Sequence, residues 1–217
     1  MSGESKINIC PDFLNFIFLE DFCIIYLCIK FLSILFTDTV TTMATGISGP
    51  NAIAFTPSVS LTYVLTDSKL YTVTAGGAKT WVAGSGLWGF ANGQGKSATF
   101  AFPSGMSVHP VTGVIYIADT QNNRIRTCTS LFLVGTLAGT GISGNVDGGS
   151  ASTTFNRPFG IVMDQTYTYL YVTCKNGNTL RQVAVSTGYT TTIAGSGAST
   201  SIDGMGLEAT FNHPAYA

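Results

Sequence analysis

Three short stretches decide the fold: TFAFP at residues 99–103, TFNRP at 154–158 and TFNHP at 210–214. They begin with Thr-Phe, end with Pro, and recur at spacings of 55 and 56 residues. Two further motifs keep the same spacings, an Ala-Gly-x-Gly at 83–86, 138–141 and 194–197, and an Asn-Gly or Asp-Gly at 92–93, 147–148 and 203–204. Several motifs in a fixed order and period predict a repeat architecture.

Each repeat contains four strand-like runs separated by turn-forming residues. In the second unit the predicted strands cover residues 105–108, 114–118, 124–129 and 131–138. In the third unit they cover 160–163, 169–173, 179–185 and 189–194. Four short antiparallel strands per repeat are typical of β-propeller blades, so we predict an all-β fold for this part of the chain.

The second unit resembles the NHL repeat family. It has PSG at 103–105, YIAD at 116–119, NNRIR at 122–126 and TLAG at 136–139. The third unit departs from this pattern because Cys174 stands where Asp119 does, and the first unit lacks the arginines. The resemblance implies a six-bladed propeller, of which three units and the start of a fourth are about half.

We therefore predict two regions, a hydrophobic N-terminal segment at 1–45 and propeller repeats at 46–217. The blades are expected at about 48–100, 101–155 and 156–211, with the start of a fourth at 212–217. This incomplete set predicts a fragment of a larger propeller. It also predicts self-association through open sheet edges, since unpaired strands invite pairing.

The N-terminal stretch at 13–36 is rich in Phe, Ile and Leu, and it is predicted as a helix long enough to span a bilayer. Three interpretations stay open: a membrane anchor, a signal peptide, or translated upstream sequence with Met43 as the true start. The first two predict a membrane or extracellular protein with membrane association through 13–36. The third predicts a cytoplasmic one.

Several recurring side chains have predicted structural roles. Phe100, Phe155 and Phe211 each precede a first strand, and we interpret them as wedges between blades. Arg126 and Arg181 recur at one position, which indicates pairing with Asp119 or with a backbone carbonyl. The Asp-Gly pairs are interpreted as turns, because one carboxylate per loop is too few for calcium.

The candidate binding face consists of the loops that enter each first strand and those that join second and third strands. Long loops on a rigid scaffold commonly carry binding residues. Trp88 and Phe90 are not required by the repeat, so they form either a contact patch or a local plug. The face comprises Trp88, Phe90, Lys96, Gln121, Asn122, Asn123, Arg157, Lys175 and Asn176.

Composition argues against several functions. The net charge of −1 gives no basis for nucleic-acid binding. The two histidines, His109 and His213, are about 100 residues apart and have no second ligand at metal spacing. The five cysteines form neither a zinc pattern nor an even disulfide set, and we interpret them as buried apolar residues. We predict no metal, cofactor or catalytic residues.

The predicted function is a non-catalytic propeller module that binds a protein or a small ligand. The alternative is part of a lactonase-like or lyase-like six-bladed propeller enzyme, with its site in blades outside this sequence. Such enzymes hold a metal in the central channel, which requires several carboxylates or histidines at the inner strand ends.

Overall fold

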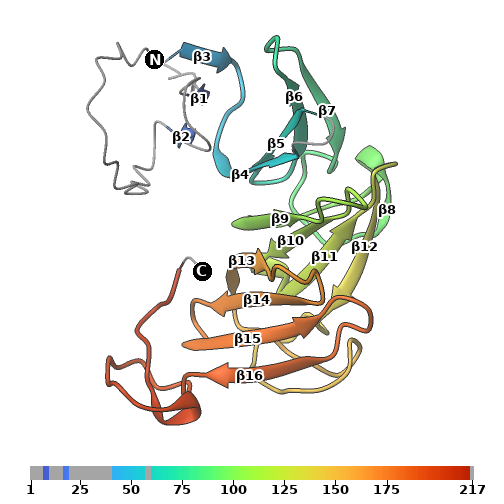
Figure 1. Ribbon diagram of the computed structural model, residues 1–217. Coiled ribbons are helices and arrows are strands. Elements are labelled where there is room, and N and C mark those ends of the chain that lie inside the picture. Colours follow the sequence, from blue (N-terminus) through green and yellow to red (C-terminus); the bar gives the residue numbers. More distant parts are fainter. Residues whose placement is uncertain (1–6, 10–16, 20–40, 57–59, 216–217) are drawn as a thin grey trace, which may run out of the picture.

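The computed structural model describes residues 7–9, 17–19, 41–56 and 60–215. From residue 50 onward, the described part of the chain forms three antiparallel sheets that follow one another along the sequence (Figure 1). Each of these sheets is one blade of four strands that pair in chain order, and the first strands of neighbouring blades lie close to one another. The β-propeller blades predicted from the repeat spacing are confirmed.

The first blade is complete although its sequence is degenerate. Its strands pair in chain order. They are β4 (Pro50–Thr56), β5 (Leu61–Thr66), β6 (Leu70–Thr74) and β7 (Lys79–Ala83).

The second and third blades have the strands that the sequence predicts, with bounds within two residues. The second contains β9 (Gly105–Val108), β10 (Ile115–Asp119), β11 (Arg124–Cys128) and β12 (Leu133–Ala138), with β8 (Gly93–Gln94) added beside β12. The third contains β13 (Pro158–Met163), β14 (Tyr169–Cys174), β15 (Thr179–Ala184) and β16 (Thr190–Ala194). Among the described residues, the loops contain the short 3-10 helices η2 (Gly95–Ser97), η3 (Thr120–Asn122) and η4 (Gly206–Glu208).

A small separate sheet precedes the blades. Its central strand β1 (Ile7–Ile9) pairs with β2 (Ile17–Leu19) and with β3 (Thr41–Ala44). The helix predicted for 13–36 is therefore wrong at Ile17–Leu19, where the chain is a strand, and the rest of that stretch lies outside the described residues. Among the described residues there is no helix with the length and apolar character to cross a membrane.

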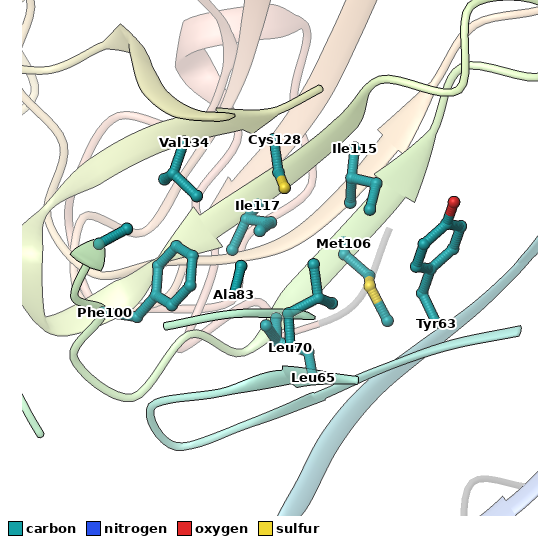
Figure 2. Close-up of a cluster of buried hydrophobic side chains, with 11 residues drawn as sticks. Tyr63, Leu65, Leu70, Ala83, Phe100, Met106, Ile115, Ile117, Cys128 and Val134 are labelled. Carbon is teal, nitrogen blue, oxygen red and sulfur yellow. The ribbon is translucent and has the colours of Figure 1, made fainter. Parts of the chain in front are cut away.

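Each blade has two faces because successive side chains of a strand point to opposite sides of its sheet. We call the face toward the following blade the forward face and the opposite one the rear face. The forward face of blade 1 meets the rear face of blade 2 in one apolar cluster (Figure 2). Its buried members are Tyr63, Leu65, Leu70, Ala83, Ala98, Phe100, Met106, Ile115, Ile117, Cys128 and Val134.

Blades 2 and 3 form a second contact of the same kind. The forward face of blade 2 supplies residues equivalent to those of blade 1, and the rear face of blade 3 supplies branched aliphatic side chains and a cysteine. The buried members are Tyr116, Ala118, Ile125, Ala138, Phe155, Ile161, Leu170, Val172, Cys174 and Val183.

The predicted phenylalanine wedges are confirmed at both interfaces, where Phe100 and Phe155 are fully buried. Each ring lies against the glycine that ends a blade. At Gly139, whose φ is +107°, a Cβ would lie 2.7 Å from the Asn123 carbonyl oxygen and 3.1 Å from the Phe155 ring. Only glycine admits both the left-handed backbone and the ring at that distance.

The rear face of blade 1 is covered by the chain that precedes it. Ala44 and Ile47 pack on Val64 and Val73, and Ile47 is only 1% exposed. The segment before the first blade thus buries apolar side chains on the rear face of that blade.

The wedges give a first testable prediction. Phe155→Ala removes a fully buried ring and is expected to lower the free energy of unfolding by about 3–5 kcal/mol. Phe211→Ala is the matched control, because this ring is partly exposed and should cost clearly less. Urea unfolding followed by fluorescence measures both, and equal losses would contradict the wedge assignment.

Candidate functional site

A buried arginine lies beneath the loops of the second blade. Both Arg126 and Asp119 are fully buried, and Arg126 Nη1 lies 2.7 Å from Asp119 Oδ2. The guanidinium also donates to the carbonyls of Thr99 (3.1 Å) and Ala91 (2.8 Å), which belong to the loop that enters the blade. The predicted pairing of Arg126 with Asp119 is confirmed, and the arginine ties the loop to the sheet.

The third blade supplies its carboxylate from another position. Cys174 replaces the strand aspartate, and Arg181 instead lies 2.8 Å from Asp147 in the loop. In the second blade the equivalent loop residue is Asn92, whose side-chain oxygen accepts from Arg126 at 2.8 Å. Each buried arginine therefore has one carboxylate partner, although the partner comes from the strand in one blade and from the loop in the other.

Solvation and hydrogen bonding oppose each other at the buried pair. Burial raises the pKa of Asp119, while hydrogen bonds from Asn122 and the Ala101 amide, together with Arg126, act to lower it. Burial likewise lowers the pKa of Arg126, and Asp119 opposes that change. All the donors of this network belong to the scaffold, so we assign the pair a structural role.

This exchange of partners gives a second prediction. Asp119→Asn leaves the buried Arg126 without a carboxylate and is expected to lower the free energy of unfolding by about 3–5 kcal/mol. Adding Asn92→Asp should recover part of the loss, because Asp147 serves Arg181 from the same loop position. A double-mutant cycle by chemical denaturation measures the coupling, and strict additivity would refute compensation.

An exposed aromatic pair stands on the loop face that the sequence predicts. The ring centroids of Trp88 and Phe102 are 4.4 Å apart at an interplanar angle of 45°. Trp88 is 64% exposed, and its neighbour Leu87 is 73% exposed. The Trp88 ring is supported on one side by Phe102 and is open to solvent over most of its surface.

Phe90 is held by cations instead. The Arg124 guanidinium carbon lies 3.7 Å from the Phe90 ring centroid, and that of Arg126 lies 4.8 Å from it. Arg124 is fixed in turn by hydrogen bonds to the carbonyls of Asn122 (3.0 Å) and Thr140 (2.5 Å). Phe90 therefore covers the buried arginine, although 45% of it is exposed.

The two predicted asparagines of the second blade tie loops together. Asn122 donates to the Gly89 carbonyl at 2.8 Å and to Asp119. Asn123 donates to the Gly141 carbonyl at 3.3 Å and accepts from the Arg157 amide at 2.9 Å. These side chains hold the face in shape.

The remaining predicted residues are spread over the same loops. Lys96 and Lys69 each place an ammonium 4.4 Å from the Trp81 ring centroid. Lys175 lies 4.8 Å from the Phe159 ring, so it is not grouped with Trp88. Gln121 and Asn176 are exposed.

Sequence reasoning missed Leu87 and Phe102 as members of this face. Phe102 stands inside the TFAFP motif, where the equivalent residues are Arg157 and His213, and all three have a positive φ of 47° to 54°. Because the backbone conformation is the same at all three positions, the repeat pattern did not draw attention to the side chain. The available signal was that Phe102 is the apolar residue of the three and follows the apolar pair Leu87-Trp88 in the same loop.

His109 and Asp164 occupy equivalent turns after the first strands of blades 2 and 3, and both stabilise those turns. His109 Nδ1 accepts from the amides of Val111 (3.2 Å) and Thr112 (3.3 Å). Asp164 takes the same place in the third blade, where hydrogen bonds from Thr166 and from backbone amides lower its pKa. Within the described ranges no three His, Cys, Asp or Glu residues form a group that could hold a metal ion.

The two described cysteines are buried in the contacts between blades. Cys128 lies between blades 1 and 2, and Cys174 between blades 2 and 3. Burial raises the pKa of the Cys128 thiol to about 12. The interpretation of these two cysteines as buried apolar residues is confirmed, while Cys10, Cys23 and Cys28 lie outside the described residues.

A third prediction concerns this thiol. A folded protein treated with iodoacetamide at about pH 8 should leave Cys128 unmodified, because the reactive thiolate is scarce at a raised pKa and the sulfur is buried. Peptide mass spectrometry measures the modified fraction, with the urea-unfolded chain as the positive control. Rapid modification in the folded state would contradict the packing described.

Comparison with known proteins identifies solved structures with a similar fold. No family model matches the chain. A structural genomics protein of unknown function from Bacteroides thetaiotaomicron is similar, with a TM-score of 0.68 and 21% identity over 82% of this chain and 45% of its own. An auxiliary nutrient binding protein from the same organism has a TM-score of 0.64 and 18% identity over 82% and 44%. The chain thus spans less than half of either structure. It belongs by fold to the β-propeller class.

Comparison of sequences finds curated proteins that are similar to part of this chain. NHL repeat-containing protein 2 is 30% identical over 108 residues in Homo sapiens, which is 46% of this chain and 14% of the relative. The Gallus gallus protein of that name is 29% identical over 102 residues. Protein SUPPRESSOR OF QUENCHING 1, chloroplastic, of Arabidopsis thaliana is 27% identical over 127 residues, 57% of this chain and 12% of its own. The blades of this chain are thus similar in sequence to parts of NHL repeat-containing proteins.

Proposed function

We propose that this chain is a non-catalytic NHL propeller module whose binding surface is the loop face around Trp88. The observation that carries the proposal is the exposed Trp88 ring, which lies tilted against Phe102 and next to the exposed Leu87. Exposed aromatic side chains on a preorganised surface are typical of contact sites, because they offer a large area at little cost in conformational entropy.

The surrounding scaffold supports this assignment. The loops below Trp88 are held by the Arg126 network and by Asn122, so the aromatic pair stands on a fixed base. Glycines at 84, 86 and 89 would otherwise leave this loop free to move. Neither ring is needed for the repeat itself, since Ser143 and Ser199 take the place of Trp88 in the other blades.

A binding role also agrees with one of the structural relatives, which is described as an auxiliary nutrient binding protein. Among the described residues, His109 and Asp164 accept hydrogen bonds from amides of their own turns, and Cys128 and Cys174 are buried.

The fourth prediction tests the surface with a matched set of variants. The immobilised chain is used to select from a phage-displayed random peptide library, with Trp88→Ala as the counter-selection target. We expect enriched peptides to bind the wild-type chain at least about tenfold more tightly than Trp88→Ala, because truncating a central aromatic contact costs more than 1 kcal/mol.

The control pair is Leu87→Ala and Leu131→Ala, which are similarly exposed at 73% and 79%. Only Leu87→Ala should weaken binding, since Leu131 lies in the turn between β11 and β12. Peptides that bind both Trp88 variants equally, or no enrichment at all, would refute the proposed surface. Turnover of lactone or ester substrates in the presence of divalent metal would instead favour the enzyme.

A further inference from the structure

A cationic side chain recurs on the loop face of blades 1 and 2 and is replaced in blade 3. Lys69 stands directly before β6, and Arg124 is the first residue of β11. The two positions are equivalent, because the residues that follow them, Leu70 and Ile125, are both fully buried in contacts between blades. In blade 3 the corresponding residue is Thr179, which is uncharged and buried.

In both blades this cation lies against the loop that leaves the same sheet. The contact is made at the second glycine of the Ala-Gly-x-Gly motif, Gly86 in blade 1 and Gly141 in blade 2. A Cβ at Gly86 would lie 2.8 Å from Lys69 Cε, and a Cβ at Gly141 would meet the Arg124 guanidinium. The cation and this loop are therefore next to each other in two successive blades.

An exposed aliphatic side chain follows each of these glycines. Leu87 is 73% exposed and Ile142 is 69% exposed, whereas blade 3 has the small Ala198 at this position. Blade 3 folds with neither the cation nor the large aliphatic residue, so the blade structure does not require them. The combination is a property of the surface of blades 1 and 2.

Aromatic rings hold these cations in place. Lys69 Nζ lies 4.4 Å from the Trp81 ring centroid, and the Arg124 guanidinium carbon lies 3.7 Å from that of Phe90. Lys96 places a second ammonium 4.4 Å from the Trp81 ring centroid. A cation that rests on a ring keeps its charge and loses little conformational freedom when it meets an anion.

The carboxylates of this region are engaged elsewhere. Asp119 and Asp147 pair with the buried arginines, and Asp67 accepts from the Asn51 amide at 2.9 Å. Among the described residues, none of the three cations on the aromatic rings has a carboxylate within ion-pairing distance. Positive charge therefore gathers beside exposed apolar side chains, although the net charge of the whole chain is −1.

We infer that the partner of this loop face is an acidic segment of protein chain that lies across blades 1 and 2. Its carboxylates pair with Lys69 and Arg124, and its apolar side chains contact Leu87 and Ile142, so charge and apolar surface are both complemented. Packed sheets lie about 10 Å apart and an extended chain covers about 3.3 Å per residue, so acidic residues at about every third position reach successive blades. The inference rests on the proposed binding function.

The test uses two phage-displayed libraries of peptides of about twelve residues, random except at every third position. That position is glutamate in one library and glutamine in the other, and both are selected on the full chain. We expect Trp88-dependent binders from the glutamate library. Their affinity should fall about threefold for Lys69→Gln or Arg124→Gln and about tenfold for the double variant, as for the loss of exposed ion pairs.

Two further variants separate charge from structure. Lys175→Gln is the matched control, because Lys175 also lies over an aromatic ring but belongs to blade 3, and it should leave binding unchanged. Arg124→Lys keeps the charge without the guanidinium and should retain the binding that Arg124→Gln loses. Unchanged circular dichroism spectra check the fold of each variant.

The outcomes distinguish this inference from the function on which it rests. Binders that depend on Trp88 but not on Lys69 or Arg124, or that come from the glutamine library alone, overturn the inference and leave the proposed surface intact. No Trp88-dependent binder from either library overturns both. A uridine oligonucleotide of about twenty nucleotides that binds as tightly, and weakens with the same variants, would replace the acidic peptide with a nucleic acid and also overturn the inference.

Discussion

The whole structure depends on the fact that a four-stranded blade has two apolar faces and cannot bury either of them alone. Each interface solves this with one fixed contact, in which Phe100 or Phe155 from the incoming loop is inserted between the sheets. The ring fits only because glycine ends the preceding blade. Stability in such an array of repeats is therefore largely a sum of contacts between neighbouring blades.

The loop face is a consequence of the same packing. The loop that delivers each phenylalanine also passes over a buried arginine, which binds its carbonyls and a side chain at its Asn-Gly or Asp-Gly turn. A buried guanidinium requires a carboxylate nearby, since an uncompensated buried charge is costly. The chain meets this requirement from the strand in blade 2 and from the loop in blade 3. The first blade has Tyr71 in place of the arginine, so no such charge arises there.

The repeat spacing was sufficient to predict the blades, the strand bounds and the phenylalanine wedges. These features follow from the alternation of apolar and polar residues and from turn residues, and both recur in each repeat. It did not predict which carboxylate serves Arg181, since Asp147 and Arg181 are far apart in sequence and meet only when the loop folds over the sheet. Phe102 was missed for the same reason, because its contact with Trp88 depends on a loop geometry that the motif conceals. The helix predicted from hydrophobicity failed at Ile17–Leu19, where β-branched and aromatic residues suit a strand as well as a helix.

Differences between repeats are therefore the most informative positions in this chain. Where all three units agree, the residue serves the blade, as with the Thr-Phe pair and the glycine that ends each sheet. Where one unit has a different residue from the other two, either a second residue compensates for the change or the new side chain is exposed. Cys174 is compensated by Asp147, and this change stays inside the scaffold. Trp88 lies against Phe102 and is mostly exposed to solvent. A repeat protein gains contact surfaces at such positions, because the neighbouring units supply the fold and leave the departing side chain free to meet something outside it.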